Sequence, residues 1–120
     1  SKIANRDLSN VNITDYPITD FKLLPVNYIM KTSTYTAVSG DFIMCDTLTT
    51  GSFNIIMPIG GNGDIISVTD IKGNWLINNL TLEPATGESI MGLPINETLI
   101  LDRNLITVTL RFLNNNWRII

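Results

Sequence analysis

The chain has 120 residues, a net charge of −3 and no histidine, and this length suits one domain with a buried core but not two. Its eight lysine and arginine residues are scattered singly, so the sequence lacks the basic patch that binds nucleic acid or an anionic bilayer. Without histidine, Ser-His-Asp and Cys-His catalytic arrangements and the common zinc sites are excluded.

The composition favours strands over helices. Isoleucine and threonine, with 18 and 14 residues, fit pleated strands, whereas the sequence has 3 alanines and no glutamine. We therefore predict an all-β fold. No apolar run approaches the roughly 20 residues of a membrane-spanning helix, so we expect no membrane insertion. The single cysteine, Cys45, lies in an apolar run and is expected to be buried and unreactive.

Residues 1–26 differ from the rest of the chain. Isolated apolar residues alternate there with charged ones, and Pro17 and Pro25 interrupt any long helix. The segment has too little apolar surface to fold alone, and two interpretations stay open: an extended leader, or a stem that orders by packing on copies of itself. In a trimeric stem, the candidate subunit-interface residues are Leu8, Val11, Ile13 and Ile18.

Residues 27–120 show short apolar or alternating runs, with turn residues at roughly ten-residue spacing. This pattern predicts a small antiparallel β-sandwich or jelly-roll-like domain. Strands are expected near 27–31, 35–38, 42–46, 53–57, 65–70, 76–83, 89–91, 97–101, 105–112 and 117–120. The Gly-rich stretch 60–64 is expected to close a hairpin between the fourth and fifth of these strands. The last three strands are expected to form an antiparallel meander, with a turn at 114–116.

Two strands are apolar on both sides of the pleat, around 55–57 and at 65–66. A lone two-sheet domain leaves one face of each sheet polar, so a doubly apolar strand predicts cover on both faces. In a chain of this size the second cover is expected from another subunit. Ile56 and Ile66 are therefore candidate subunit-interface residues.

The carboxylates are the remaining candidates for catalysis, as the acid and base of a glycosidase. Most of them stand beside Gly, Asn or Thr, where a carboxylate usually forms a turn or caps a helix. The stretch 60–64 is similar to a calcium-binding glycine repeat, but its Asp64 comes one position early and the stretch occurs once. We therefore expect no catalytic residue, no metal and no cofactor, and a protein that is not an enzyme.

Aromatic side chains are the candidates for contact with a receptor. Trp75 follows Lys72-Gly73-Asn74 in an expected loop, and Asn78 and Asn79 are close by. An exposed indole would stack on a sugar ring, whereas a buried one would pack in the core, and the sequence leaves both interpretations open. Tyr35 is a further candidate receptor contact.

An ordered set of short motifs runs from Tyr35 to the end of the chain. It includes Tyr35-Thr36-Ala37, Gly40-Asp41, Gly51-Ser52-Phe53, Gly73-Asn74, Asn79-Leu80-Thr81 and Trp117-Arg118-Ile119. In this order the set resembles the C-terminal β module of bacteriophage tail-fibre, tailspike and baseplate-associated fibre proteins. The stretch 60–64 departs from the family pattern because it is shorter and richer in glycine.

The resemblance implies a non-enzymatic structural and adhesive module in the tail of the virion. Such a module would form a homotrimer, join other phage tail or baseplate proteins, and attach to a bacterial surface polysaccharide or outer-membrane receptor. Its place as distal tip or as connector stays open. Two alternatives remain: a fragment of a carbohydrate-degrading tailspike, and a free monomeric carbohydrate-binding domain.

Overall fold

The computed structural model describes residues 27–120, which form ten strands and one short helix. The strands are β1 (Asn27–Lys31), β2 (Tyr35–Thr36), β3 (Asp41–Cys45), β4 (Phe53–Ile56), β5 (Ile65–Asp70), β6 (Leu80–Glu83), β7 (Ser89–Ile90), β8 (Leu99–Leu101), β9 (Thr107–Leu113) and β10 (Asn116–Ile119). The helix α1 (Thr47–Thr50) lies between β3 and β4. The predicted all-β fold is confirmed, and residues 1–26 lie outside the described part.

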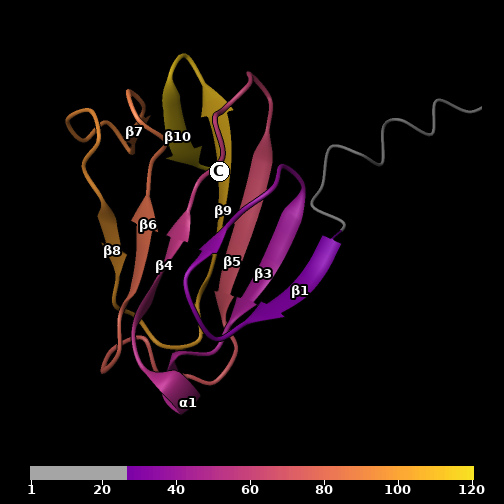
Figure 1. Cartoon of the computed structure of the whole chain (residues 1–120), viewed down its shortest axis with the longest axis vertical. Coiled ribbons are helices and arrows are strands. Elements are labelled where there is room, and N and C mark those ends of the chain that lie inside the picture. Colours follow the sequence, from indigo (N-terminus) through magenta and orange to yellow (C-terminus); the bar gives the residue numbers. More distant parts are fainter. Residues whose placement is uncertain (1–26) are drawn as a thin grey trace, which may run out of the picture.

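The strands form two sheets, and the chain passes from one sheet to the other at each connection from β1 to β8 (Figure 1). The larger sheet has the order β1-β3-β5-β9-β10-β7, and the smaller sheet has the order β2-β4-β6-β8. Because each sheet receives every second strand, β1, β3 and β5 are parallel, as are β2, β4 and β6. These six strands therefore make three stacked coils, the arrangement of a short solenoid.

The prediction of an antiparallel domain is wrong for these coils. Only the pairs β5–β9, β9–β10 and β6–β8 are antiparallel, and β10–β7 is parallel. Period-two alternation is the same in both kinds of sheet, because it reports which side chains are buried and not the direction of the neighbouring strand. The direction follows here from connections that cross between sheets.

One end of the stack is open within residues 27–120. There β1 pairs only with β3, and β2 pairs only with β4. The Asn27 N–H bonds to the Gly40 carbonyl and the Lys31 carbonyl accepts from Asp46, so alternate groups of β1 face β3. The N–H and C=O groups of Tyr28 and Met30 consequently point to the open edge.

The core lies between the two sheets and is filled by both. Across the larger sheet, Ile29, Ile43, Val68 and Val108 stand in register and face inward, and Tyr35, Ile55, Leu82 and Leu99 do so across the smaller sheet. Each fully buried aliphatic side chain contributes about 1.5–3 kcal/mol relative to an exposed one. The two inward ladders therefore hold the sheets together.

Two expected hairpins had different outcomes. The β9–β10 hairpin is confirmed, and its turn residues Asn114 and Asn115 have φ of 53° and 61°, as a tight turn of this kind requires. The hairpin through 60–64 is wrong, because β4 and β5 belong to different sheets. The expected meander is also wrong in its first strand, since β8 pairs with β6 in the smaller sheet.

The expected strand 76–83 begins only at Leu80. The preceding residues form a turn, in which the N–H groups of Ile77 and Asn78 both bond to the Asn74 carbonyl. Residues 47–50, between two expected strands, form α1, whose first turn is capped by the Asp46 side chain. Local side-chain hydrogen bonds override the apolar pattern in both segments.

The doubly apolar strands are mostly covered by the chain itself. Ile66 faces the core and is fully buried, and Ile65, on the opposite side of the pleat, is only 5% exposed. Ile66 is therefore a core residue, and its predicted place in a subunit interface is wrong. Ile56 is half-buried on the outer face of the smaller sheet. The other interface candidates, Leu8, Val11, Ile13 and Ile18, lie outside the described residues.

Candidate functional site

Three of the four predicted receptor-contact residues lie in one loop, between β5 and β6. Trp75, Asn78 and Asn79 are held there by the chain's own backbone: Asn79 Nδ2 donates to the Trp75 carbonyl at 2.6 Å, and Asn78 Nδ2 donates to the Thr47 carbonyl at 3.0 Å. Both amide groups thus fix the loop. Tyr35 belongs to β2 and is not part of this cluster.

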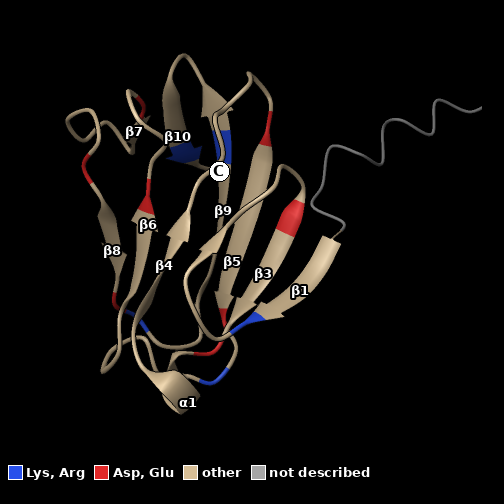
Figure 2. Ribbon diagram, in the orientation of Figure 1, with Lys and Arg blue, Asp and Glu red and all other residues tan. Residues whose placement is uncertain are grey.

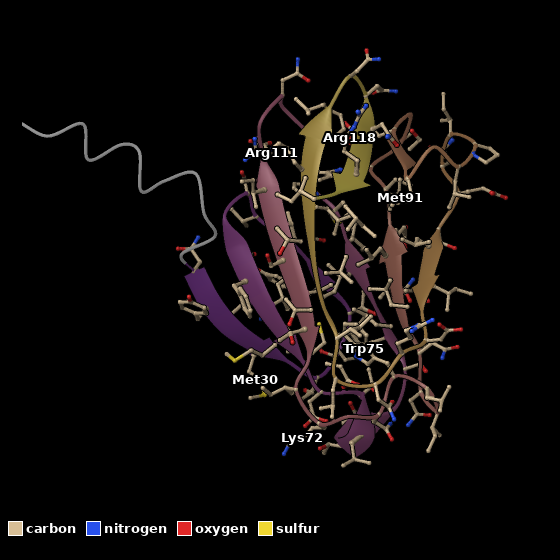
Figure 3. All side chains as sticks on the ribbon, turned by 180° about the vertical axis from the view of Figure 1, so that it is seen from behind. Met30, Lys72, Trp75, Met91, Arg111 and Arg118 are labelled. Carbon is tan, nitrogen blue, oxygen red and sulfur yellow. The ribbon has the colours of Figure 1, made fainter. Side chains whose placement is uncertain are left out.

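The Trp75 side chain is completely buried, and Figure 3 shows it near the end of the molecule where the short helix lies. Its ring offers no face to a sugar, so the interpretation of Trp75 as a stacking platform is wrong and the core interpretation holds. Trp117, in β10, is fully buried as well. The large exposed aromatic side chain of residues 27–120 is Tyr28, at 67%.

The Tyr35 side chain contacts two charged groups, the Asp41 carboxylate and the Lys31 ammonium. Its hydroxyl donates to Asp41 Oδ2 at 2.8 Å, and the Lys31 ammonium lies 4.3 Å from the centre of its ring. Burial and the bond to Asp41 raise the pKa of Tyr35 to about 12, so the phenol stays neutral. The hydroxyl is therefore a structural donor to the turn before β3, where Asp41 also accepts the Val38 N–H.

The loop 71–79 is organised by one buried carboxylate. Asp70 Oδ1 accepts the N–H groups of Gly73 and Asn74 at 3.0 and 3.1 Å. Asp70 Oδ2 accepts those of Trp75 and Leu105 at 3.1 and 2.9 Å. Burial alone would raise the pKa of Asp70, but these four donors outweigh it and hold the pKa below its ordinary value. The carboxylate therefore stays ionised and binds both the loop 71–79 and the loop before β9 that contains Leu105.

A second carboxylate fixes α1 beside this loop. Asp46 accepts the N–H groups of Leu48 and Thr49 at 3.0 and 3.1 Å, and the Thr49 hydroxyl at 2.8 Å. These bonds, the one from the Thr49 hydroxyl first, lower the pKa of Asp46. The side chain of Asn74 then donates to the Thr47 carbonyl at 3.3 Å and joins α1 to the loop.

These rigid loops hold a group of aliphatic side chains in solvent at one end of the molecule, where α1 lies (Figure 1). We call this group the apolar loop end; it consists of Leu48, Ile71, Leu76, Ile77 and Leu105. Ile77 is 78% exposed and Leu105 is 73% exposed. Hydrogen bonds prevent their collapse inward, because the Leu76 N–H is bound by Asn104 at 2.9 Å and the Leu105 N–H by Asp70. These exposed apolar side chains make this end a candidate interaction site.

A second exposed apolar group lies on the outer face of the larger sheet at its open edge. It consists of Tyr28 and Met30 on β1 with Phe42 and Met44 beside them on β3, and we call it the edge apolar surface. The Tyr28 and Phe42 ring centres are 5.1 Å apart. Tyr28 and Met30 are 67% and 50% exposed, whereas Phe42 and Met44 are half-buried.

The described residues show no constellation for metal or thiol chemistry. No group of three potential metal ligands occurs in 27–120. Cys45 is fully buried, as predicted, and burial, together with the charge of Asp70, raises the pKa of its thiol to about 12. No helix in this part of the chain is long and apolar enough to span a bilayer.

Comparison with known proteins assigns no family. No protein-family model matches the chain, and no curated protein is significantly similar to it.

The sequence placed Trp75 in a loop but expected a strand from residue 76, whereas the loop runs to Asn79. It selected the aromatic and amide side chains, which are buried or hydrogen-bonded, and missed the aliphatic ones, Leu76 and Ile77, which are exposed. The available signal was Asp70, because an aspartate before a Gly-Asn pair often accepts backbone N–H groups and turns the chain. Residues that follow such a turn directly are part of the loop, so the strand begins later than the apolar pattern predicts.

Proposed function

We propose that the chain is a non-enzymatic structural and adhesive module of a bacteriophage tail fibre or baseplate fibre. It assembles as a homotrimer on the tail of the virion and contributes to attachment to the bacterial surface. The motif resemblance from Tyr35 to Ile119 supports this assignment, and the coil architecture supports a fibrous context. Coils that stack along one direction extend a fibre without the need for a new core.

The edge apolar surface is the observation that carries the proposal. Tyr28 and Met30 expose apolar side chains and, within residues 27–120, backbone groups without a strand partner at the same edge. An edge of this kind promotes association unless it is covered. Closed threefold symmetry covers it on each copy and leaves three identical outer faces, which multiplies weak attachment sites into avidity.

Light scattering on the full chain tests assembly. The expected mass is about three times the 13.3 kDa of one chain. Met30→Glu should shift the mass toward that of the monomer, because it places a charge in the edge apolar surface. Ile100→Glu is the matched control, since Ile100 is 56% exposed on a strand of the smaller sheet. A parent chain that stays monomeric contradicts the proposal.

Attachment is assigned to the apolar loop end, whose side chains suit contact with a protein receptor on the outer membrane. A fluorescently labelled chain should bind a subset of strains in a bacterial panel, and Ile77→Asp should abolish that binding. Ile95→Asp, at a residue 58% exposed outside this end, should bind as the parent does. Release of reducing sugars from capsule would instead indicate a tailspike fragment, and a monomer that binds neutral oligosaccharides a free carbohydrate-binding domain.

A further inference from the structure

Two arginines stand directly opposite each other on the outer face of the larger sheet. Arg111 of β9 and Arg118 of β10 are partners in the antiparallel register, so both side chains project from the same face. The Cβ atoms of such partners are about 4.5–5.5 Å apart. Figures 2 and 3 show the two basic residues side by side on neighbouring strands.

Among residues 27–120, no carboxylate is hydrogen-bonded to either guanidinium group. Arg118 Nη2 donates to the Leu113 carbonyl at 3.4 Å, and the buried Nε of Arg111 has no hydrogen-bond partner among residues 27–120. Ile65 is the partner of Arg111 on the other side, in β5. The neighbouring Asp64 carboxylate accepts the Gly61 N–H at 2.9 Å.

Like charges directly opposite on one sheet face destabilise the sheet, and an unpaired buried N–H has a further cost. An oxyanion between the two guanidinium groups would offset the repulsion between them. Each guanidinium is a planar fork that bonds two oxygens of a phosphate or carboxylate group, and the two arms start close enough to reach one group together. The strands that carry them are joined by the tight turn at Asn114 and Asn115, which fixes their register.

We propose that Arg111 and Arg118 form a binding site for an oxyanion, the phosphate or carboxylate group of an acidic glycan. The glycan part rests on the proposed attachment function, whereas the oxyanion site rests on the arginine pair alone. A free phosphate ion offers the same chemistry, so the experiment compares the two sources. The site is separate from the apolar loop end, because it lies on the outer face of the sheet.

Titration of the full chain with sodium phosphate at constant ionic strength tests the site, followed by NMR of the arginine side chains and by calorimetry. The Arg111 and Arg118 Nε–H signals should shift, and those of Arg103 should not. Arg118→Gln should weaken phosphate binding about tenfold or more, since it removes charge-assisted hydrogen bonds. Arg118→Lys should weaken it less, because the charge remains but the fork is lost. Arg103→Gln, at an exposed loop residue, is the matched control.

Arg111 is half-buried, so its replacement risks unfolding the chain. Arg118 is exposed, so the test relies on variants at that position. Oligoglucuronate and a phosphorylated oligosaccharide form the glycan arm, and their neutral counterparts are the controls. Tighter binding of the acidic oligosaccharides than of free phosphate supports the glycan source. Equal binding limits the site to the ion and overturns the glycan part. Absence of saturable phosphate binding, or unchanged binding by Arg118→Gln, overturns the oxyanion site, whatever the oligomeric state.

Discussion

The carboxylate of Asp70 accepts the backbone N–H of Leu105 at 2.9 Å, and this bond joins the loop after β5 to the loop before β9. The two residues are far apart in the sequence, yet the same side chain also bonds the loop 71–79 at Gly73, Asn74 and Trp75. One buried carboxylate therefore sets the shape of the apolar loop end. Its removal should affect stability and attachment together.

Asp70→Asn should lower the free energy of unfolding by about 3 kcal/mol, because the amide cannot accept all four N–H groups and leaves buried donors unpaired. Urea denaturation measures the loss. Asp102→Asn, at an exposed residue of the other loop, should change the free energy by less than about 0.5 kcal/mol. Equal stability of the two variants would show that the Asp70 bonds contribute little.

Acid should weaken the parent more than Asp70→Asn. The folded-state pKa of Asp70 lies below the ordinary aspartate value of about 3.9, so its contribution is fully present above that value. The contribution is lost as the pH falls through the folded-state pKa. Denaturation curves measured from about pH 6 down to about pH 2 should therefore converge for parent and variant. A constant difference across this range would contradict the lowered pKa.

Trp75→Ala should cost about 3–5 kcal/mol of stability, as expected for the loss of a fully buried indole. The neighbouring Leu76 is 66% exposed, and Leu76→Ala should be nearly neutral. Thermal and chemical denaturation measure both variants. If Trp75→Ala melted like the parent, the buried position of the ring would be refuted.

Gly60→Ala should destabilise the chain by about 1–3 kcal/mol, as overpacking of a core does. A Cβ at Gly60 would lie 2.4 Å from the Phe112 ring, which is itself packed edge-on against Trp117. At Gly61 the nearest atom to such a Cβ is an Asp64 carboxylate oxygen at 3.6 Å. Gly61→Ala is therefore the matched control for measuring the unfolding free energy, and equal losses in both variants would exclude the clash.

Within residues 27–120, the edge of the larger sheet at β1 is open and exposes apolar side chains. Tyr28 and Met30 of β1 lie beside Phe42 and Met44 of β3 and extend their side-chain rows to the edge strand. In the interior of the sheet each such row is flanked on both sides, whereas at β1 it is flanked on one. The proposed trimer would cover this surface, and the mass of the full chain and of Met30→Glu tests that proposal.

The amino-acid sequence by itself placed the strands along the chain, although it began the one at β6 four residues too early. Strands β1 and β5 have the predicted bounds, and the alternating residues Val108, Leu110 and Phe112 of β9 lie in the core. This agreement arises because period-two burial is a local property of the chain. The Asn-rich turn was also predictable, because asparagine accepts positive φ.

Only the tertiary structure decided which strands pair, and in which direction. The coils form because each connection crosses to the other sheet, and a crossing leaves no mark in the alternation of either strand. The same holds for the candidate sites. Asp70 and Leu105, like Arg111 and Arg118, acquire their roles from neighbours that the fold supplies, because hydrogen bonds and like-charge contacts depend on distance in space.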